Sequence, residues 1–278
     1  MVKIDLHSHT TASDGRTSPT ESVQLAARKG LAALAITDHD SVSGIGEALE
    51  AAQGLDLEII PGIEVSTGLN GMDIHVLGYF LDYENEQLQQ DLALLRETRN
   101  KRNELMIARL NELGIDITYE EVAAKQKTKE GNIGRPHIAE VLIDKQVVSS
   151  MEEAFREYLG KHGKAYIHPP RISPEEGVEL ILRYGGIPVL AHPGLYDLDH
   201  IIPSLVEVGL KGIEVFHPDH TDRDKEKYLR MAERYGLIVT GGSDYHGERN
   251  GVIFHADLGS QAVPPEALMK LKELKRKG

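Results

Sequence analysis

Short apolar runs alternate with amphipathic segments along most of the chain, which is the rhythm of a domain built from strands and helices in turn. The clearest run is Leu31 to Thr37, LAALAIT, which is nearly continuous in apolar residues, as in a strand buried on both faces. Before it, Ser18 can cap a helix whose first position is Pro19 and whose Glu21 completes a capping box. Gly30 can end that helix. The pattern favours a largely parallel sheet covered by helices.

The same alternation continues along the rest of the chain. Further strands are expected over residues 2–6, 57–65, 72–81, 187–191, 212–216 and 237–240. Further helices are expected over residues 46–52, 174–183, 198–208 and 223–235. Strands and helices in regular turn predict an α/β barrel or a doubly wound sheet. The barrel is favoured because polar candidate ligands follow several strands, and barrel enzymes place their chemistry at the C-terminal ends of strands.

Between residues 84 and 166 the rhythm changes to helical spacing almost throughout. A leucine-lined face over residues 88–95 is followed by polar residues from 96 to 104, which predicts that a helix leaves the core there. We assign residues 1–100 and 167–278 to the barrel and residues 101–166 to a helical insertion that covers the active site.

The composition is that of an ordinary globular protein of 278 residues, of which 40% are hydrophobic and 27% charged. Thirty-one basic residues against forty-four acidic ones give a net charge of −13, which repels polyanions and argues against broad nucleic-acid binding. An anionic substrate therefore needs local positive charge, which bound metal ions and nearby arginines could supply. The chain has no cysteine, so any metal must be held by His, Asp and Glu.

Nothing in the sequence points to a membrane or to secretion. The first ten residues, MVKIDLHSHT, carry acidic and histidine residues where a secretory signal would need an apolar run. No later stretch approaches the roughly 18 apolar residues of a spanning helix. We therefore expect a cytoplasmic protein with no membrane partner.

Histidines and carboxylates recur where the expected strands end. His7 and His9 are separated by one residue, so a strand projects both from one edge of the sheet, although such a pair alone is weak evidence for a metal. The recurring positions are Asp38, His39, Asp40, Glu64, His75, His192, Asp244 and His246. Convergent ionisable groups without a cation would incur large desolvation and repulsion, so we predict a metal site.

These positions fall in motifs that resemble those of a known family, the polymerase and histidinol phosphatase (PHP) superfamily. The motifs are Asp5-Leu6-His7-Ser8-His9, Thr37-Asp38-His39-Asp40, Gly62-Ile63-Glu64, Ala191-His192-Pro193 and Ser243-Asp244-Tyr245-His246. The resemblance implies a distorted seven-stranded (β/α) barrel, the PHP fold, with three divalent metal ions at its C-terminal face. Manganese is the ion expected first, with iron and zinc as alternatives.

Carried over motif by motif, the resemblance implies three sets of metal ligands. The first set is His7, His9, Glu64 and Asp244. The second set is Glu64, His75 and His192. The third set is Asp14, His39 and His246, in which Asp14 departs from the histidine of many family members. The side chains expected to lie behind the ligands and to orient the imidazole rings are Asp5, Asp38 and Asp40.

Within the superfamily the chain is most similar to the nucleoside 3′,5′-bisphosphate phosphatase branch, whose relatives include a 5′-to-3′ exoribonuclease. The similarity rests on Asp14, Arg99-Asn100-Lys101-Arg102 and Gly134-Arg135-Pro136-His137. In that branch the two basic segments hold the phosphate and the nucleotide of the substrate. From the residues alone, Arg99 and Arg102 also fit a solvated helix face. The second segment also fits a helix start, and a helix N-terminus beside an arginine is a good phosphate site.

The resemblance implies a phosphoesterase in which a metal-bridged water attacks phosphorus without a protein nucleophile. We expect removal of the 3′-phosphate of a nucleoside 3′,5′-bisphosphate, and the same pocket is compatible with stepwise removal of 5′-nucleotides from short RNA. His217, after an expected strand, fits either an acid/base or phosphate contact or a packed histidine. The alternatives are a histidinol phosphatase and a PHP module that binds metal or nucleic acid without catalysis.

Overall fold

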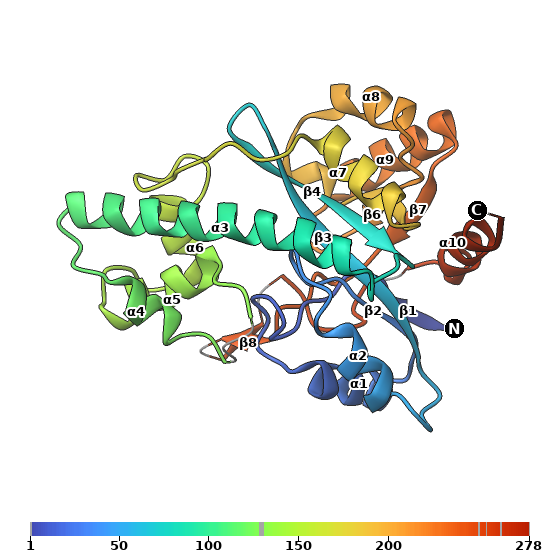
Figure 1. The fold of residues 1–278 in the computed structure, drawn as a ribbon, viewed down its shortest axis with the longest axis horizontal. Coiled ribbons are helices and arrows are strands. Elements are labelled where there is room, and N and C mark those ends of the chain that lie inside the picture. The colour runs from blue at the N-terminus through green and yellow to red at the C-terminus, as the bar shows by residue number, and fades with distance from the viewer. Residues whose placement is uncertain (1, 128–130, 250, 254, 262, 278) are drawn as a thin grey trace.

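A seven-stranded sheet forms the centre of the protein (Figure 1). The computed structural model describes residues 2–127, 131–249, 251–253, 255–261 and 263–277. The strands lie side by side in chain order and are β1 Lys3–Asp5, β2 Leu31–Ile36, β3 Glu58–Leu69, β4 Met72–Tyr79, β5 Ile187–Leu190, β6 Gly212–Phe216 and β7 Ile238–Gly241. The seven expected strands are thus confirmed. A short separate ribbon pairs β8 Glu248–Arg249 with β9 Val252–Ile253.

One strand of the described sheet departs from the parallel arrangement that the sequence pattern predicted. β4 runs antiparallel to both of its neighbours, β3 and β5, whereas the other neighbouring pairs are parallel. Asn70 and Gly71 make the reversal in a two-residue turn, and their φ angles of 50° and 77° suit an Asn-Gly hairpin. Because β4 is reversed, its first half lies at the edge where the parallel strands end. His75 therefore reaches that edge, opposite Ser66 of β3.

The first and last strands of this order approach each other. The backbone N–H of Leu6, just after β1, donates to the carbonyl oxygen of Gly241 in β7 at 3.3 Å. Just beyond, Ser8 and Tyr245 pair in parallel. Segments more than two hundred residues apart in the chain thus meet, and the predicted α/β class is confirmed.

Helices cover the outside of the sheet (Figure 1). They are α1 Pro19–Arg28, α2 Ile45–Ala51, α7 Pro174–Arg183, α8 Ile202–Glu207, α9 Asp222–Tyr235 and α10 Pro265–Lys277. α1 begins as predicted, because the N–H of Glu21 donates to Oγ of Ser18 at 3.1 Å and the N–H of Ser18 donates to Oε2 of Glu21 at 2.8 Å. In the described part of the chain, every helix is too short or too polar to cross a lipid bilayer.

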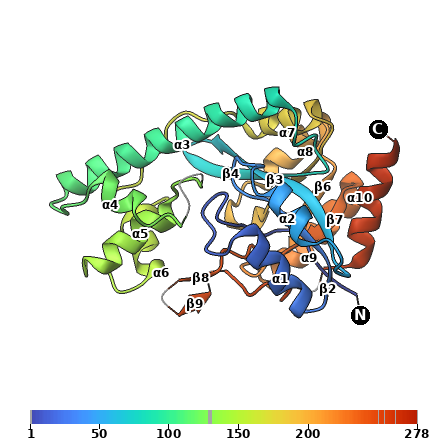
Figure 2. The same cartoon turned by 60° about the horizontal axis from the view of Figure 1, so that its bottom comes forward.

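One long helix joins the sheet to the helical insertion. α3 Glu86–Glu112 has 27 residues and runs from above the sheet to the far end of the insertion (Figure 2). Leu88 and Leu92 belong to the core around the sheet, whereas Met106 and Leu110 belong to a separate core. The remaining elements of the insertion are α4 Tyr119–Ala123, α5 Arg135–Asp144, α6 Met151–Ala154 and a π-helical turn over Phe155–Leu159. The predicted boundary at residue 101 falls inside α3.

The polar stretch of α3 over residues 96–104 lies between the two cores, as expected for a helix that leaves the sheet core there, but one of its faces is buried rather than solvated. Arg99, Arg102 and Asn103 are buried. Lys101 and Glu104 pair with each other on the exposed face of the helix. The buried polar face points toward carboxylates of the sheet, so the polarity here marks a site rather than an outer surface.

We expect the insertion core to contribute substantially to stability. Leu110 is fully buried in that core, so Leu110→Ala should lower the free energy of unfolding by about 2 to 5 kcal/mol. Leu105→Ala on the same helix, where the side chain is 39% exposed, should cost less than about 1 kcal/mol. Denaturant unfolding measures both. A loss at Leu110 no larger than at Leu105 would contradict the packed insertion core.

Candidate metal centre

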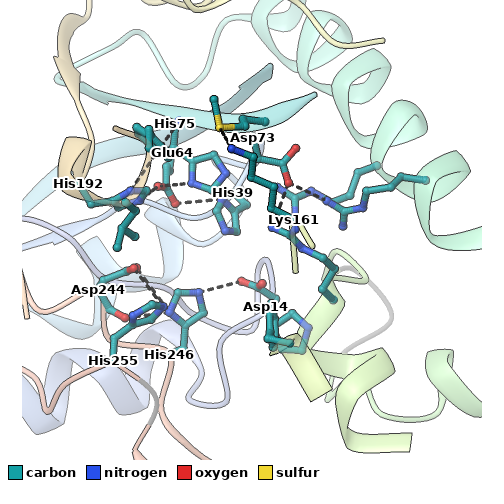
Figure 3. Close-up of a pocket in the computed structure, with 18 of the residues that line it drawn as sticks. Asp14, His39, Glu64, Asp73, His75, Lys161, His192, Asp244, His246 and His255 are labelled. Atoms are coloured by element: carbon teal, nitrogen blue, oxygen red, sulfur yellow. Dashed lines mark hydrogen bonds and ion pairs between the residues drawn. The ribbon is translucent and has the colours of Figure 1, made fainter. Parts of the chain in front are cut away.

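A cavity of about 290 Å³ opens where the parallel strands end (Figure 3). One wall carries imidazoles and carboxylates, namely Asp14, His39, Glu64, His75, His192, Asp244, His246 and His255. The opposite wall carries cations, namely Arg99, Arg102, Arg135 and Lys161. His7 and His9, which follow β1, are fully buried at the base of the first wall. The predicted ligands thus come together from six strands of the sheet.

The first predicted ligand set converges on one point. Nε2 of His7 and Nε2 of His9 lie 3.2 Å apart. Oε2 of Glu64 lies 3.4 and 3.2 Å from these two atoms, and Oδ1 of Asp244 lies 3.3 and 3.1 Å from them. Ligands bound to one ion at about 2.0 to 2.2 Å are separated by about 3.0 to 3.5 Å, so the spacing fits a shared cation.

Glu64 also faces the second set with its other oxygen. Oε1 of Glu64 lies 2.9 Å from Nδ1 of His75 and 3.0 Å from Nε2 of His192. The structure adds His39, whose Nδ1 lies 3.0 Å from Oε2 of Glu64 and which clusters with Glu64 and His75. His39 was predicted for the third set alone, and the structure places it between the second and third sets.

The third set gathers around Asp14. Oδ1 of Asp14 lies 3.4 Å from Nε2 of His246 and 3.9 Å from Nδ1 of His9. His39 belongs to the same cluster, in which the candidate ligand atoms lie within 4.8 Å of one another. His9 therefore presents one ring nitrogen to the first set and the other to the third, a double role that the sequence did not predict.

Buried atoms without hydrogen-bond partners test whether these residues fit a metal. Among the described residues they include Nδ1 of His9, His39 and His75, Oε2 of Glu64 and Oδ1 of Asp244. Each such atom would cost about 1 to 3 kcal/mol if nothing satisfied it. Their lone pairs converge within one cavity, so divalent cations account for them together. A donor set of imidazoles and carboxylates without thiolates suits manganese, iron or zinc.

Burial and the neighbouring rings set the protonation of Glu64 and His39, whereas nearby carboxylates raise the pKa of His7 and His9. Burial alone would raise the pKa of Glu64, yet His75, His39 and His7 hold that pKa well below its usual range. Burial lowers the pKa of His39 to about 3. The carboxylate is thus charged and the His39 ring neutral, which is the protonation state in which each binds a cation.

Two residues that the sequence interpretation missed hold the rings in place. Glu214 is fully buried in β6 and its Oε1 lies 3.0 Å from Nδ1 of His7, which leaves Nε2 of His7 to face the ligand set. The hydroxyl of Tyr196 and Nδ1 of His192 share a hydrogen bond of 2.8 Å. The available signal for Glu214 was a charged residue in the middle of an apolar strand, GIEVF.

The three aspartates expected to orient imidazoles bind other groups instead. Asp5 accepts backbone N–H bonds from His7 and Ser243. Asp38 accepts from the backbone N–H and hydroxyl of Thr10 and from the hydroxyl of Ser13. Asp40 accepts from the N–H of Ser66 and from Arg99. These hydrogen bonds fix the loops that carry the ligands, and Asp40 also holds Arg99.

Of the two interpretations left open for His217, the structure agrees with the packed histidine. It is fully buried behind Asp244, with its Nε2 3.3 Å from Oδ2 of Asp244, and it is absent from the described lining of the cavity. His255, which the sequence interpretation missed, does line the cavity (Figure 3). Its Nε2 lies 3.4 Å from Oδ2 of Asp244 and its Nδ1 lies 2.7 Å from Oδ2 of Asp219.

The predicted basic segments divide between the cavity and the surface. Arg99, Arg102 and Arg135 all line the cavity, and Arg99 also binds Oδ2 of Asp40 at 3.1 Å. Lys101 is 65% exposed, and neither it nor Asn100 is among the residues that line the cavity. Gly134 caps α5 beside Asp14, where a Cβ would lie 2.8 Å from Oδ2.

Loss of the Glu64 charge should weaken two ion sites at once. Glu64→Gln keeps nearly the same shape, and we expect binding of both ions to weaken by more than the roughly 10- to 100-fold that loss of an outer partner costs. Elemental analysis after dialysis measures the bound ions. Glu58→Gln on the same strand, where the side chain is 43% exposed, is the matched control. Full metal content in Glu64→Gln would refute the bridging role.

Glu214→Gln should lower the affinity of the ion beside His7 by roughly 10- to 100-fold, because the ring loses its charged partner. Titration with a competing chelator measures this affinity. Glu207→Gln on the exposed face of α8 should leave it unchanged. Equal affinities in the wild type and Glu214→Gln would show that Glu214 is a packing residue without influence on the ligand.

Comparisons with known proteins agree with the motifs. A model of the PHP domain matches residues 5–184. The chain is 35% identical over 256 residues to the 3′,5′-nucleoside bisphosphate phosphatase of Chromobacterium violaceum, covering 90% of each chain. It is 33% identical over 252 residues to the 5′-3′ exoribonuclease Rnm of Escherichia coli, covering 88% of this chain and 85% of that one.

Two further relatives extend the comparison. The chain is 33% identical over 247 residues to the phosphoribosyl 1,2-cyclic phosphate 1,2-diphosphodiesterase of Eggerthella lenta, covering 88% of this chain and 94% of that one. A solved structure from Bifidobacterium adolescentis, described as a candidate metal-dependent phosphoesterase, matches with a TM-score of 0.89 and 31% identity over 98% of this chain and 96% of that one. The chain therefore belongs to the PHP domain family of phosphoesterases.

Proposed function

We propose that the protein is a metal-dependent phosphatase that removes the 3′-phosphate of nucleoside 3′,5′-bisphosphates and releases a 5′-nucleotide and inorganic phosphate. The observation that carries this proposal is that the candidate metal ligands and a group of arginines open onto one cavity. A substrate with two phosphates can present one to the metals and the other to the guanidinium groups. The relative named for this reaction shares 35% identity with the chain.

Three divalent ions, manganese foremost, are proposed for the centre. Bound there, they supply the Lewis acidity that activates water and offsets charge on the phosphoryl group. His7, His9, Glu64 and Asp244 would hold the first ion, Glu64, His75 and His192 the second, and Asp14, His39 and His246 the third. Glu214 and Tyr196 orient their rings, and no protein nucleophile is part of the proposal.

The arginine wall would bind the second phosphate. Arg102 and Arg135, which line the cavity, are proposed for this contact, and Arg171, which is 3% exposed and outside the described lining, adds positive charge through Asp73, the carboxylate that it shares with them. Guanidinium groups suit this role because each can donate two parallel hydrogen bonds to a phosphate. Arg99, which also lines the cavity, is paired with Asp40 and remains a further candidate for this contact, whereas Lys101 faces outward and we assign it no phosphate contact.

A closed barrel is the proposed form of the sheet. Its support is the Leu6–Gly241 hydrogen bond and the Ser8–Tyr245 pair between the segments that follow β1 and β7. Closure would fix His7 and His9 relative to Asp244, which come from opposite ends of the strand order.

Stepwise removal of 5′-nucleotides from short RNA is a second candidate, favoured by the 33% identity to an exoribonuclease. The cyclic phosphodiesterase relative adds a third substrate class at the same identity. A screen of the metal-loaded protein should include adenosine 3′,5′-bisphosphate, histidinol phosphate, short 5′-phosphorylated RNA and phosphoribosyl 1,2-cyclic phosphate. Fastest turnover of the bisphosphate supports the proposal, faster turnover of another substrate replaces it, and no turnover supports a non-catalytic module.

Arg135 should affect substrate selection rather than the chemical step. Arg135→Ala should lower kcat/KM for adenosine 3′,5′-bisphosphate by about 10- to 100-fold, or about 1.4 to 2.8 kcal/mol, because a charge-assisted contact to the second phosphate is lost. An aryl phosphate, which lacks a second phosphate, should be hydrolysed almost as well as by the wild type. Arg183→Ala, where the side chain is 62% exposed, is the matched control. Equal losses on both substrates would place Arg135 in support of the metal centre instead.

A further inference from the structure

One carboxylate, that of Asp73, lies among Arg102, Arg135 and Arg171. Oδ2 of Asp73 lies 2.9 Å from Nη2 of Arg135 and 3.8 Å from Nη1 of Arg102. Oδ1 of Asp73 lies 3.4 Å from Nε of Arg171 and 3.6 Å from Nδ1 of His168. Figure 3 shows Asp73 facing the cavity on the side away from Asp244 and His246.

The charges of this group do not balance. Every described ion pair of Arg102, Arg135 and Arg171 ends on Asp73, so three positive charges share one negative charge. Arg102 and Arg171 are almost fully buried, and burial together with the neighbouring Arg135 and Arg171 lowers the pKa of Arg102 well below its usual range. Uncompensated buried cations lower the stability of the folded protein, so a bound anion would stabilise this group.

The strand β4 relates this group to the metal centre. Asp73 and His75 are two residues apart, so both project from the same face of the strand, about 6.6 Å apart along it. One anion bound by the arginines and another beside His75 would therefore be separated by a distance of the same order. This spacing suits two phosphates on different carbons of one sugar better than two phosphates that share an oxygen.

We propose that Asp73 is a built-in competitor for the second phosphate: it occupies the arginines in the free protein and is displaced from Arg135 when a phosphorylated ligand binds. Arg135 is the partner that can move, because its side chain is 20% exposed whereas those of Arg102 and Arg171 are 2% and 3% exposed. Arg171 and His168 would continue to hold Asp73. This inference rests on the proposed function for the identity of the ligand.

The competition would serve product release. The 5′-nucleotide product keeps the phosphate that the arginines bind, so a subsite with excess positive charge and no competing anion would retain it. Asp73 offers the arginines an alternative partner at every turnover. Product release limits turnover in many enzymes, and a lower affinity for the shared phosphate speeds that step.

The first test measures binding without turnover. Inorganic sulfate is titrated by calorimetry into the metal-loaded wild type, Asp73→Asn and, as a control for the same change at a side chain that is 98% exposed, Asp222→Asn. Removing a negative charge next to the bound anion should tighten sulfate binding about tenfold in Asp73→Asn, while Asp222→Asn should stay within about twofold of the wild type. Adding Arg135→Ala to Asp73→Asn should abolish most of the gain in sulfate affinity. A gain that persisted without Arg135 would instead come from sulfate bound at the metals.

Kinetics on adenosine 3′,5′-bisphosphate give a readout that a merely structural role would not produce. In Asp73→Asn we expect KM to fall, kcat to fall with it, and inhibition by adenosine 5′-monophosphate to strengthen about tenfold. If the protein does not hydrolyse this substrate, the proposed function fails, but the sulfate titration still decides the role of Asp73.

Weaker or unchanged sulfate binding in folded Asp73→Asn would overturn the inference and show that Asp73 is a scaffold for the arginines. If that variant does not fold, a crystal structure of the wild type soaked in sulfate decides instead. We expect sulfate on Arg135 and the Arg135–Asp73 contact opened. An intact contact, with sulfate on the arginines or elsewhere, would equally overturn it.

Discussion

The convergence of five imidazoles on the buried carboxylate of Glu64 is the constraint on which the site depends. Glu64 is 1% exposed, and the nearest ring nitrogens of His7, His9, His39, His75 and His192 lie 2.9 to 3.4 Å from its oxygens. His7 and His9 follow β1, His39 follows β2, His75 lies in β4 and His192 follows β5. Folding of the sheet therefore brings the ligands together. Ligand convergence of this kind couples metal affinity to folding stability, since the unfolded chain holds no such site.

The sequence predicted the strands and the ligand candidates because apolar strands are short and their polar ends stand out. Glu64 and His192 are examples, each directly beside an apolar run. Glu214 was missed because it interrupts such a run and its partner, His7, is 207 residues away. The buried face of α3 was left open for a similar reason: Arg99 has the polarity of a surface residue, and only the tertiary position of Asp40 shows why it is buried.

The overall charge of the chain and the charge of the cavity wall have opposite signs. A chain with a net charge of −13 repels polyanions at long range, yet one wall of the cavity is cationic. The cations come from α3, from the start of α5 and from the segment that returns to the sheet, so the helical insertion builds most of this wall. The packing of these segments therefore positions the cations that line the cavity.

The Asn70-Gly71 hairpin has a consequence for which changes in length the chain can tolerate. The turn fixes the register of β4 against β3, and after Met72 the side chains alternate, with Asp73 and His75 lining the cavity and Ile74 fully buried between them. Loss or gain of one residue between the turn and Asp73 would reverse this alternation, turning Ile74 toward the cavity and both Asp73 and His75 into the apolar interior. Related chains can therefore vary in residue type along this strand, but their number of residues between the turn and the histidine should remain constant.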